Sequence, residues 1–301
     1  MLDQHSVLNE IATAVQNEQC VLFLGAGVHA PAPPGSPFQY DLPDRPLIGS
    51  ELSLYLAKRS DFLERRPDED PKNLPRVAMD FDLTKSRGLL IDTVRAAVQT
   101  GKQPSPILRA LARLPFPLVL TTNYDTLFED AAASFTGIDR KVPFVCSYRN
   151  NVEREEVTDQ YPYRRSFPSA GLPLVVKIHG DILRNAASIV ITEEDYIQFL
   201  LRMTDKGDFH PLPSDSRMLL SKWPTLFVGY SLRDYNLRLL LRSLRWKVEL
   251  PPEMYSVDRS PDPLLFEIYR QPPHKMVYVI EDVWRFVPEL FKRVIGADLG
   301  S

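Results

Sequence analysis

Four short runs of apolar residues along the chain end abruptly in small or polar residues. The runs are VLFLGAG at residues 21–27, VLTTNYD at 119–125, VVKIHGD at 175–181 and TLFVGYS at 225–231. Continuous β-branched and aliphatic runs of this length are typical of parallel strands that are buried on both faces. Ligands of open α/β sheets bind at the carboxyl edge, where such strands end. The pattern therefore predicts a nucleotide site with a catalytic pair at that edge.

The segments between these runs alternate between helical and strand spacing. Residues 47–114 show only helical spacing, which predicts a helical module inserted between the first two strands. Six prolines within residues 31–46 predict an irregular loop beside the glycine turn. Further helices are predicted at 6–18, 126–133, 193–201, 234–246 and 283–294, and further strands at 142–147, 188–191 and 276–280.

Strands that alternate with helices favour an α/β fold. We expect a single domain over residues 1–301 with a doubly wound, mostly parallel, Rossmann-like sheet, and with the helical module at about 47–114. The length of 301 residues, with 44% hydrophobic and 25% charged residues, is ordinary for a globular protein with a sizeable core.

The charge balance narrows the class of partner. A formal net charge of −3 and a pI near 6.0 provide no overall attraction to nucleic acid or to an anionic membrane, so we expect no direct nucleic-acid binding. The first ten residues, MLDQHSVLNE, lack the basic and apolar regions of a signal peptide. No stretch approaches the roughly 18 apolar residues that a membrane span needs. We therefore expect a cytoplasmic protein without a membrane anchor.

Five motifs occur in an order that matches one family. They are GAG at residues 25–27, TTNYD at 121–125, KIHGD at 177–181, ITEEDY at 191–196 and GYSLRD at 229–234. In this set and order the chain resembles the sirtuin-like fold, and specifically the bacterial branch found in antiphage defence proteins that degrade NAD. The match extends over about residues 6–290, and five motifs in strand and helix context are far more specific than one.

The resemblance implies catalytic roles for Asn123 and His179. An imidazole with an ordinary pKa of about 6.5 can accept a proton at neutral pH, and we assign His179 as the general base. The amide of Asn123 can hold a water or a ribose hydroxyl against the anomeric carbon. The expected cofactor-binding residues, with NAD as the substrate, are Gly25, Ala26, Gly27, Asp125, Gly229 and Ser231.

Each expected cofactor-binding group has its own chemical reason. The glycines allow the backbone to approach a pyrophosphate, and Asp125 can accept hydrogen bonds from a carboxamide such as that of nicotinamide. Ser231 is expected on the adenosine side of the dinucleotide.

Structural alternatives remain open for several of these residues. The GAG segment also fits a simple tight turn, and a lone histidine at a strand end is commonly a hydrogen-bonded structural residue. Asp125 is placed to cap the helix that follows it. The acidic residues 193–195 fit the start of a helix better than a catalytic acid pair.

The cysteine content separates this chain from the protein-deacylating sirtuins, which carry four zinc-binding cysteines. Only Cys20 and Cys146 are present, and they form no C-x-x-C pair, so we expect no metal site and no zinc. Acyl-lysine chemistry is thereby disfavoured. A second departure is His29, which stands where the family often has a serine.

The leading hypothesis is an NAD glycohydrolase that cleaves NAD to nicotinamide and ADP-ribose, as a regulated antiphage defence effector that depletes NAD. Such an activity must be controlled, which suggests a homo-oligomer or an activating protein partner of the ATPase or Argonaute type. The alternatives are a non-catalytic subunit that binds NAD or ADP-ribose, and an NAD-dependent deacylase or ADP-ribosyltransferase.

Overall fold

Seven parallel strands form one sheet in a computed structural model that describes residues 4–150, 168–204, 210–230, 238, 241, 252–271 and 276–299. The strand order is β3-β4-β2-β1-β5-β6-β7, and every neighbouring pair is parallel. The strands are β1 (Val21–Leu24), β2 (Leu118–Thr121), β3 (Phe144–Ser147), β4 (Leu174–Lys177), β5 (Thr225–Val228), β6 (Met254–Val257) and β7 (Met276–Val279). The expected parallel α/β sheet is confirmed.

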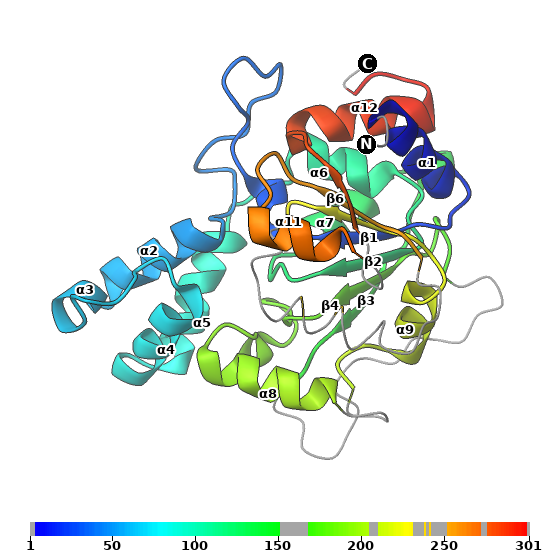
Figure 1. Ribbon diagram of the computed structural model, residues 1–301. Helices are drawn as coiled ribbons and strands as arrows, with labels where there is room; N and C mark the ends of the chain where they lie inside the picture. Colours follow the sequence, from blue (N-terminus) through cyan, green and yellow to red (C-terminus); the bar gives the residue numbers. More distant parts are fainter. Residues whose placement is uncertain are drawn as a thin grey trace.

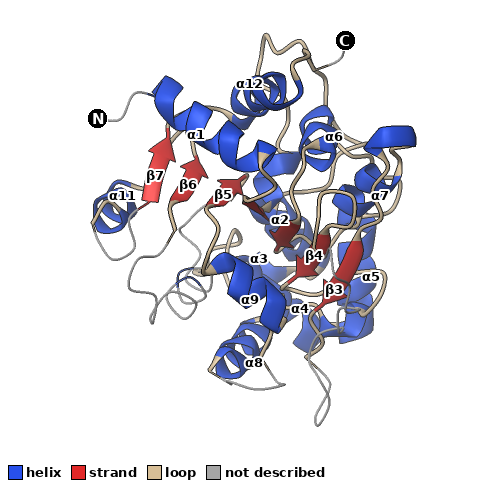
Figure 2. Ribbon diagram, turned by 90° about the vertical axis from the view of Figure 1, so that its right-hand side faces the viewer, coloured by secondary structure: helices blue, strands red, loops and turns tan. Residues whose placement is uncertain are grey.

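Alternate side chains of the strands enter two separate cores, because successive residues of a strand point to opposite faces of the sheet. In β1, Leu22 and Leu24 pack in one cluster, and Val21 and Phe23 pack in the other. The first cluster is covered by α1 (Gln4–Gln16), α6 (Pro106–Arg113), α7 (Leu127–Ala133) and α12 (Val283–Ile295). The second is covered by α8 (Glu193–Met203), α9 (Ser214–Leu220) and α11 (Pro263–Tyr269). Figures 1 and 2 show helices on both faces of the sheet, which is the doubly wound arrangement.

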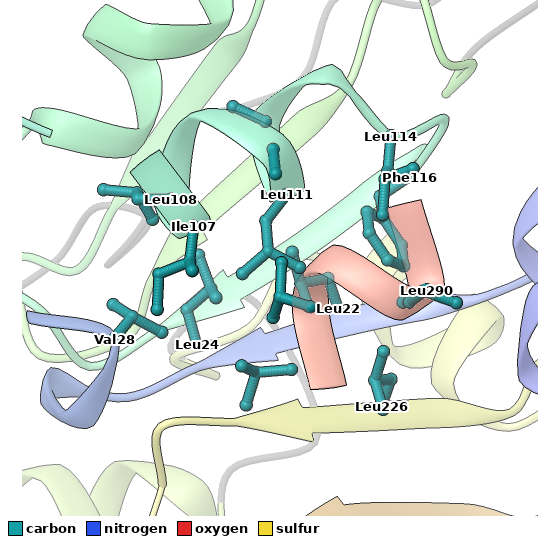
Figure 3. Close-up of a cluster of buried hydrophobic side chains, with 14 of the residues drawn as sticks. Leu22, Leu24, Val28, Ile107, Leu108, Leu111, Leu114, Phe116, Leu226 and Leu290 are labelled. Atoms are coloured by element: carbon teal, nitrogen blue, oxygen red, sulfur yellow. The ribbon is translucent and has the colours of Figure 1, made fainter. Parts of the chain in front are cut away.

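Helix α6 illustrates how the sequence specifies a covering helix. The Ser105 hydroxyl accepts a hydrogen bond from the Leu108 N–H at 3.0 Å, and proline at the first helical position has no N–H to leave unsatisfied. Ile107 and Leu111 then point toward β1, where Leu24 and Leu22 lie, as Figure 3 shows, and Leu108 belongs to the same buried cluster. Each fully buried aliphatic side chain of this kind contributes about 1.5–3 kcal/mol.

Four helices between β1 and β2 form a separate group. They are α2 (Gly49–Arg59), α3 (Phe62–Arg65), α4 (Leu74–Thr84) and α5 (Arg87–Val98). Their cluster includes Tyr124, which follows β2, and Ile182, Ile189 and Ile191, which follow β4. The group therefore lies against the carboxyl edge of the sheet, and Figure 1 shows it projecting to one side. The range 47–114 is helical as expected, but α6 belongs to the layer on the sheet.

One predicted strand is wrong. Residues Ala186–Ser188 form a short 3-10 helix, Ile189 after it is extended, and residues 189–191 pair with none of the described strands. Their backbone groups have partners outside any ladder: Val190 donates to the carbonyl of His179 at 2.9 Å, and its own carbonyl accepts from the Tyr124 hydroxyl at 2.7 Å. The buried apolar run is thus a connection that joins two strand ends.

Other differences concern elements that the apolar pattern did not predict. Strand β6 and helices α9 and α11 were not expected. The loop at 31–46 is irregular, as expected. Helix 234–246 lies outside the described residues except for Arg238 and Leu241, both helical. None of the described helices has the length and apolar character needed to cross a lipid bilayer.

Candidate active site

The ends of β1, β2, β4 and β5 meet at the carboxyl edge of the sheet. Leu24 of β1 is in register with Thr121 of β2 on one side and with Val228 of β5 on the other, and Thr121 is in register with Lys177 of β4. Connections leave β1 and β5 in opposite directions, so the switch point at which α/β sheets bind ligands lies between these two strands. All four sequence motifs that end a strand are therefore brought together as predicted.

The glycines of the first and fourth motifs pack two turns against each other. The Gly27 N–H donates to the Gly229 carbonyl at 2.7 Å, and the Gly25 N–H donates to the Val228 carbonyl at 3.0 Å. A Cβ on Gly25 would lie 2.4 Å from the Gly229 oxygen, and one on Gly27 would lie 2.7 Å from it. Close backbone approach thus explains the glycines, and these two amides already have protein acceptors. A role for Gly25, Ala26, Gly27 and Gly229 in holding NAD stays a prediction, and Ser231 lies outside the described residues.

Asn123 presents an unused acceptor at this edge. Its side-chain amide nitrogen lies 3.4 Å from the Gly25 carbonyl oxygen. A carbonyl can only accept, so this contact assigns the Nδ2 end of the amide and leaves Oδ1 on the other side. Asn123 Oδ1 is buried and has no hydrogen-bond partner among the residues that the structure describes. Because buried polar atoms are normally satisfied, Oδ1 is a candidate contact for a ligand.

His29 joins Asn123 and Asp125 in one polar cluster. Its Nε2 lies 3.2 Å from Asp125 Oδ2 and 3.4 Å from Asn123 Nδ2, and its Nδ1 lies 3.4 Å from the Tyr40 hydroxyl. His29 is only 2% exposed and Asp125 only 5%. The sequence assigned catalytic roles to Asn123 and His179 alone, and the structure places His29 beside Asn123.

Asp125 lies one residue before Thr126, the N-cap of α7, and it also belongs to the cluster. Its Oδ1 accepts from the Leu127 N–H at 3.1 Å, at the start of α7. Burial acts to raise the pKa of this carboxyl, but the charges of His29 and Lys177 and the hydrogen bond from His29 outweigh burial and hold the pKa below its ordinary value. Asp125 is therefore an anion in the site at neutral pH.

Lys177 supplies a buried cation behind the cluster. Its ammonium donates to the carbonyl of Asp125, lies 3.1 Å from Glu129 Oε1 and 3.7 Å from Asp181 Oδ2, and is fully buried. Burial acts to lower the pKa of Lys177, but the nearby carboxylates outweigh it and raise the pKa above its ordinary value. A lysine that is buried within an apolar strand needs carboxylate or carbonyl partners. The lysine in the run VVKI therefore could have identified Lys177 as part of a buried polar cluster from the sequence alone.

His179 lies at the end of β4 with an aromatic surround. It is 4% exposed, and its ring meets Tyr196 and Phe199 edge to face, with centroids 5.2 Å and 5.5 Å away. Both rings belong to α8, which begins with a capping box: Thr192 Oγ1 accepts from the Asp195 N–H, and Asp195 accepts from the Thr192 N–H. The acidic residues 193–195 begin a helix, as we expected in preference to a catalytic acid pair.

Arg87 of α5 ties the helical group to the loop behind His179. Its guanidinium lies 2.8 Å from Asp195 Oδ2 and donates to the Ile189 carbonyl at 2.7 Å. The loop at residues 189–191 and the start of α8 are therefore both held by α5.

Two further features lie away from the cluster. A surface hollow of about 530 Å³ between α1 and the start of β5 is at the opposite, amino edge of the sheet. Cys20 and Cys146 are both buried, form no disulfide with each other, and belong to different core clusters. Within the described ranges, no three His, Cys, Asp or Glu side chains are grouped as metal ligands would be.

Comparison with known proteins places this geometry in a family. The SIR2-like domain matches residues 117–276, which is more than half of the chain. The chain belongs to the SIR2-like family. The matched part of this SIR2-like chain carries Asn123, Asp125, His179 and Gly229, whereas His29 and the first glycine turn precede it.

The names of relatives of the SIR2-like chain refer to NAD hydrolysis and to defence. NAD(+) hydrolase ThsA of Enterococcus faecium is 30% identical over 167 residues, which cover 54% of this chain and 29% of the relative. NAD(+) hydrolase ThsA of Cytobacillus dafuensis is 27% identical over 248 residues, 81% of this chain and 41% of the relative. Defense-associated sirtuin 2 of Bacillus subtilis is 25% identical over 253 residues, 81% of this chain and 21% of the relative. The alignments span less than half the length of each of these relatives.

Proposed function

We propose that this SIR2-like chain is an NAD glycohydrolase that cleaves NAD to nicotinamide and ADP-ribose. The observation that carries the proposal is the buried Oδ1 of Asn123, which has no partner in the described part of the chain and lies at the carboxyl edge of the sheet, one strand from the edge position of His179. The names of two relatives, NAD(+) hydrolase, support the choice of reaction.

The reaction replaces nicotinamide by water at the anomeric carbon of the ribose. The carbon–nitrogen bond breaks, and its electron pair leaves with the nicotinamide ring, which becomes neutral. Asn123 Oδ1 accepts a hydrogen bond from the attacking water and orients it. His179 accepts the proton of that water as the general base, and the products are nicotinamide, ADP-ribose and a proton.

Asp125 and the aromatic surround fit the charge that develops. The sugar becomes cation-like as nicotinamide leaves, and the Asp125 carboxylate is an anion in the same cluster. Its two oxygens offer about four acceptor positions, so bonds to His29 and Leu127 leave room for a nicotinamide carboxamide. Tyr196 and Phe199 beside His179 exclude bulk water from the base.

The remaining parts of the proposal concern binding and control. Gly25, Ala26, Gly27, Gly229 and Ser231 form the NAD-binding set, with no metal required. The role is NAD depletion in antiphage defence, which the relative named defense-associated sirtuin supports. Control by self-association or by an activating protein of ATPase or Argonaute type belongs to the same proposal.

The test incubates the purified chain with NAD and measures nicotinamide and ADP-ribose by chromatography, with NAD binding measured separately by calorimetry. His179→Ala is expected to lower turnover about 10²–10⁴-fold, since that is the usual contribution of a general base, and Asn123→Ala is expected to lower it as well. His5→Ala, on the far helix α1, is the matched histidine control and should retain full activity.

Each other outcome refutes the hydrolase. Binding of NAD without cleavage indicates a regulatory subunit. Label from NAD that becomes attached to protein indicates an ADP-ribosyltransferase. If the chain neither binds nor cleaves NAD, then NAD is not its ligand.

A further inference from the structure

We propose that His29 is a positioning residue of this site, which holds the side chains of Asn123 and Asp125 in the arrangement that hydrolysis needs. The inference rests on the proposed function for its catalytic readout, and it concerns a residue that precedes the matched SIR2-like segment. It starts from the contacts of one buried imidazole.

The backbone fixes where His29 lies. β1 ends at Leu24, and the 3-10 helix η1 (Ala26–His29) turns the chain back over the strand ends. The Gly27–Gly229 hydrogen bond holds this turn in place, and the Ala30 N–H donates to the Gly27 carbonyl at 3.1 Å. His29 thereby reaches Asn123, which is 94 positions away in the sequence.

Tyr40 determines the proton on one ring nitrogen. The Tyr40 hydroxyl donates its single hydrogen to the Gln103 carbonyl at 2.7 Å. Toward His29 Nδ1, 3.4 Å away, the phenol oxygen can therefore only accept, so Nδ1 donates to it. The loop that carries Tyr40 holds one side of the imidazole.

Asp125 faces the other ring nitrogen. Nε2 lies 3.2 Å from Asp125 Oδ2, and a carboxylate anion is an acceptor only, so this pair is satisfied when Nε2 also donates. Both ring nitrogens therefore face protein partners, and the ring offers no free nitrogen to a water. His29 is thus assigned to positioning, and His179 keeps the role of base.

The contact with Asn123 is the one through which His29 can affect catalysis. The Asn123 amide nitrogen lies 3.4 Å from the Gly25 carbonyl oxygen and 3.4 Å from His29 Nε2. Because Nε2 and the amide nitrogen are both donors, the second contact is steric packing of the ring against the amide and not a hydrogen bond. Without the imidazole, the amide has space to rotate, and Oδ1 would no longer be fixed at one place. A displacement of about 1 Å in a positioning group can cost about 100-fold in rate.

The experiment compares His29→Ala with His29→Gln, whose amide can replace one donor. For His29→Ala we expect kcat to fall about 100-fold while KM for NAD changes less than about threefold, because Asn123 acts on the reacting centre. His29→Gln should recover at least about a tenth of wild-type kcat. His5→Ala again serves as the matched histidine control.

A second readout does not depend on activity. The two side-chain amide protons of Asn123, assigned by their loss in Asn123→Asp, are expected to have separate and shifted NMR signals in the wild type. In His29→Ala these signals should move to the positions of a solvent-exposed asparagine, and in His29→Gln and the milder Tyr40→Phe they should stay closer to the wild type.

The outcomes separate the two proposals. If the wild type neither binds nor cleaves NAD, the proposed function fails, and the Asn123 signals still decide the role of His29. Unchanged Asn123 signals in folded His29→Ala, or an unchanged kcat, overturn the positioning role. Equal loss of activity in His29→Ala and His29→Gln, with unmoved signals, overturns it as well.

Discussion

Replacing Gly229 by alanine tests the close contact between the turns after β1 and β5. Gly229 has φ +68°, and an added Cβ would lie 2.3 Å from the backbone nitrogen of Val28 and 2.8 Å from the carbonyl carbon of Gly27. A left-handed backbone costs a residue with a Cβ about 1–2 kcal/mol. Overpacking against immobile atoms adds about 1–3 kcal/mol. Together these terms predict that Gly229→Ala lowers the free energy of unfolding by about 2–5 kcal/mol.

Gly101→Ala is the matched control for this substitution. Gly101 has nearly the same backbone angle, φ +69°, but no atom lies within 4 Å of its added Cβ. Only the backbone term applies to it, which predicts a loss of about 1–2 kcal/mol. Both variants would be unfolded in urea and followed by circular dichroism, and the difference between them measures the crowding alone. If Gly229→Ala loses no more stability than Gly101→Ala, the two turns do not form the rigid contact described above.

Two buried lysines give further predictions. Lys177→Met should destabilise the fold by about 3–5 kcal/mol because it leaves the carboxylates of Glu129 and Asp181 without their cation. Adding Glu129→Gln should restore part of that loss in urea unfolding, and a single variant as stable as the wild type would contradict the argument. Burial lowers the pKa of Lys141 to about 8, whereas the pKa of lysine in the unfolded chain is about 10.4. Between about pH 8 and about pH 10.4, the unfolded chain therefore binds a proton that the folded chain lacks. The free energy of unfolding then rises with pH. The stability of the wild type relative to Lys141→Met should therefore increase by up to about 1.4 kcal/mol per pH unit above pH 8, and a constant difference between pH 7 and 10 would refute the shift.

The sequence was most informative where a single rule governs a segment. β1, β2, β4 and β5 are buried on both faces, and a strand in that position must be apolar at every residue, which is the pattern that predicted them. Strand β6 was not predicted because Ser256 interrupts the apolar run of its four residues, MYSV. The side chain of Ser256 is nevertheless buried. The run at 189–191 has the same apolar character as a strand, but its hydrogen bonds go to side chains and to the end of β4, which no local pattern reveals.

The candidate site was predictable to the level of strand ends. Asn123, Asp125 and His179 are at one edge because parallel strands end together, and the motifs gave those positions. The place of His29 was not predictable, since its partners Tyr40 and Asn123 come from an aperiodic loop and from a different strand end. The aromatic rings beside His179 come from α8, which was predicted as a helix but with no indication of which face it buries.

The position of the helices α2 to α6 between two adjacent strands has a consequence for how the chain folds. Leu24 and Thr121 are 97 positions apart, yet they pair at the centre of the sheet, next to the proposed site. Closing so long a segment is entropically unfavourable until the intervening residues become compact. Helices whose contacts are mostly local can form early and draw the two strands together. Substitutions in the core of α2–α5 are therefore expected to slow refolding of the whole sheet, even though none of those helices lies within its layers.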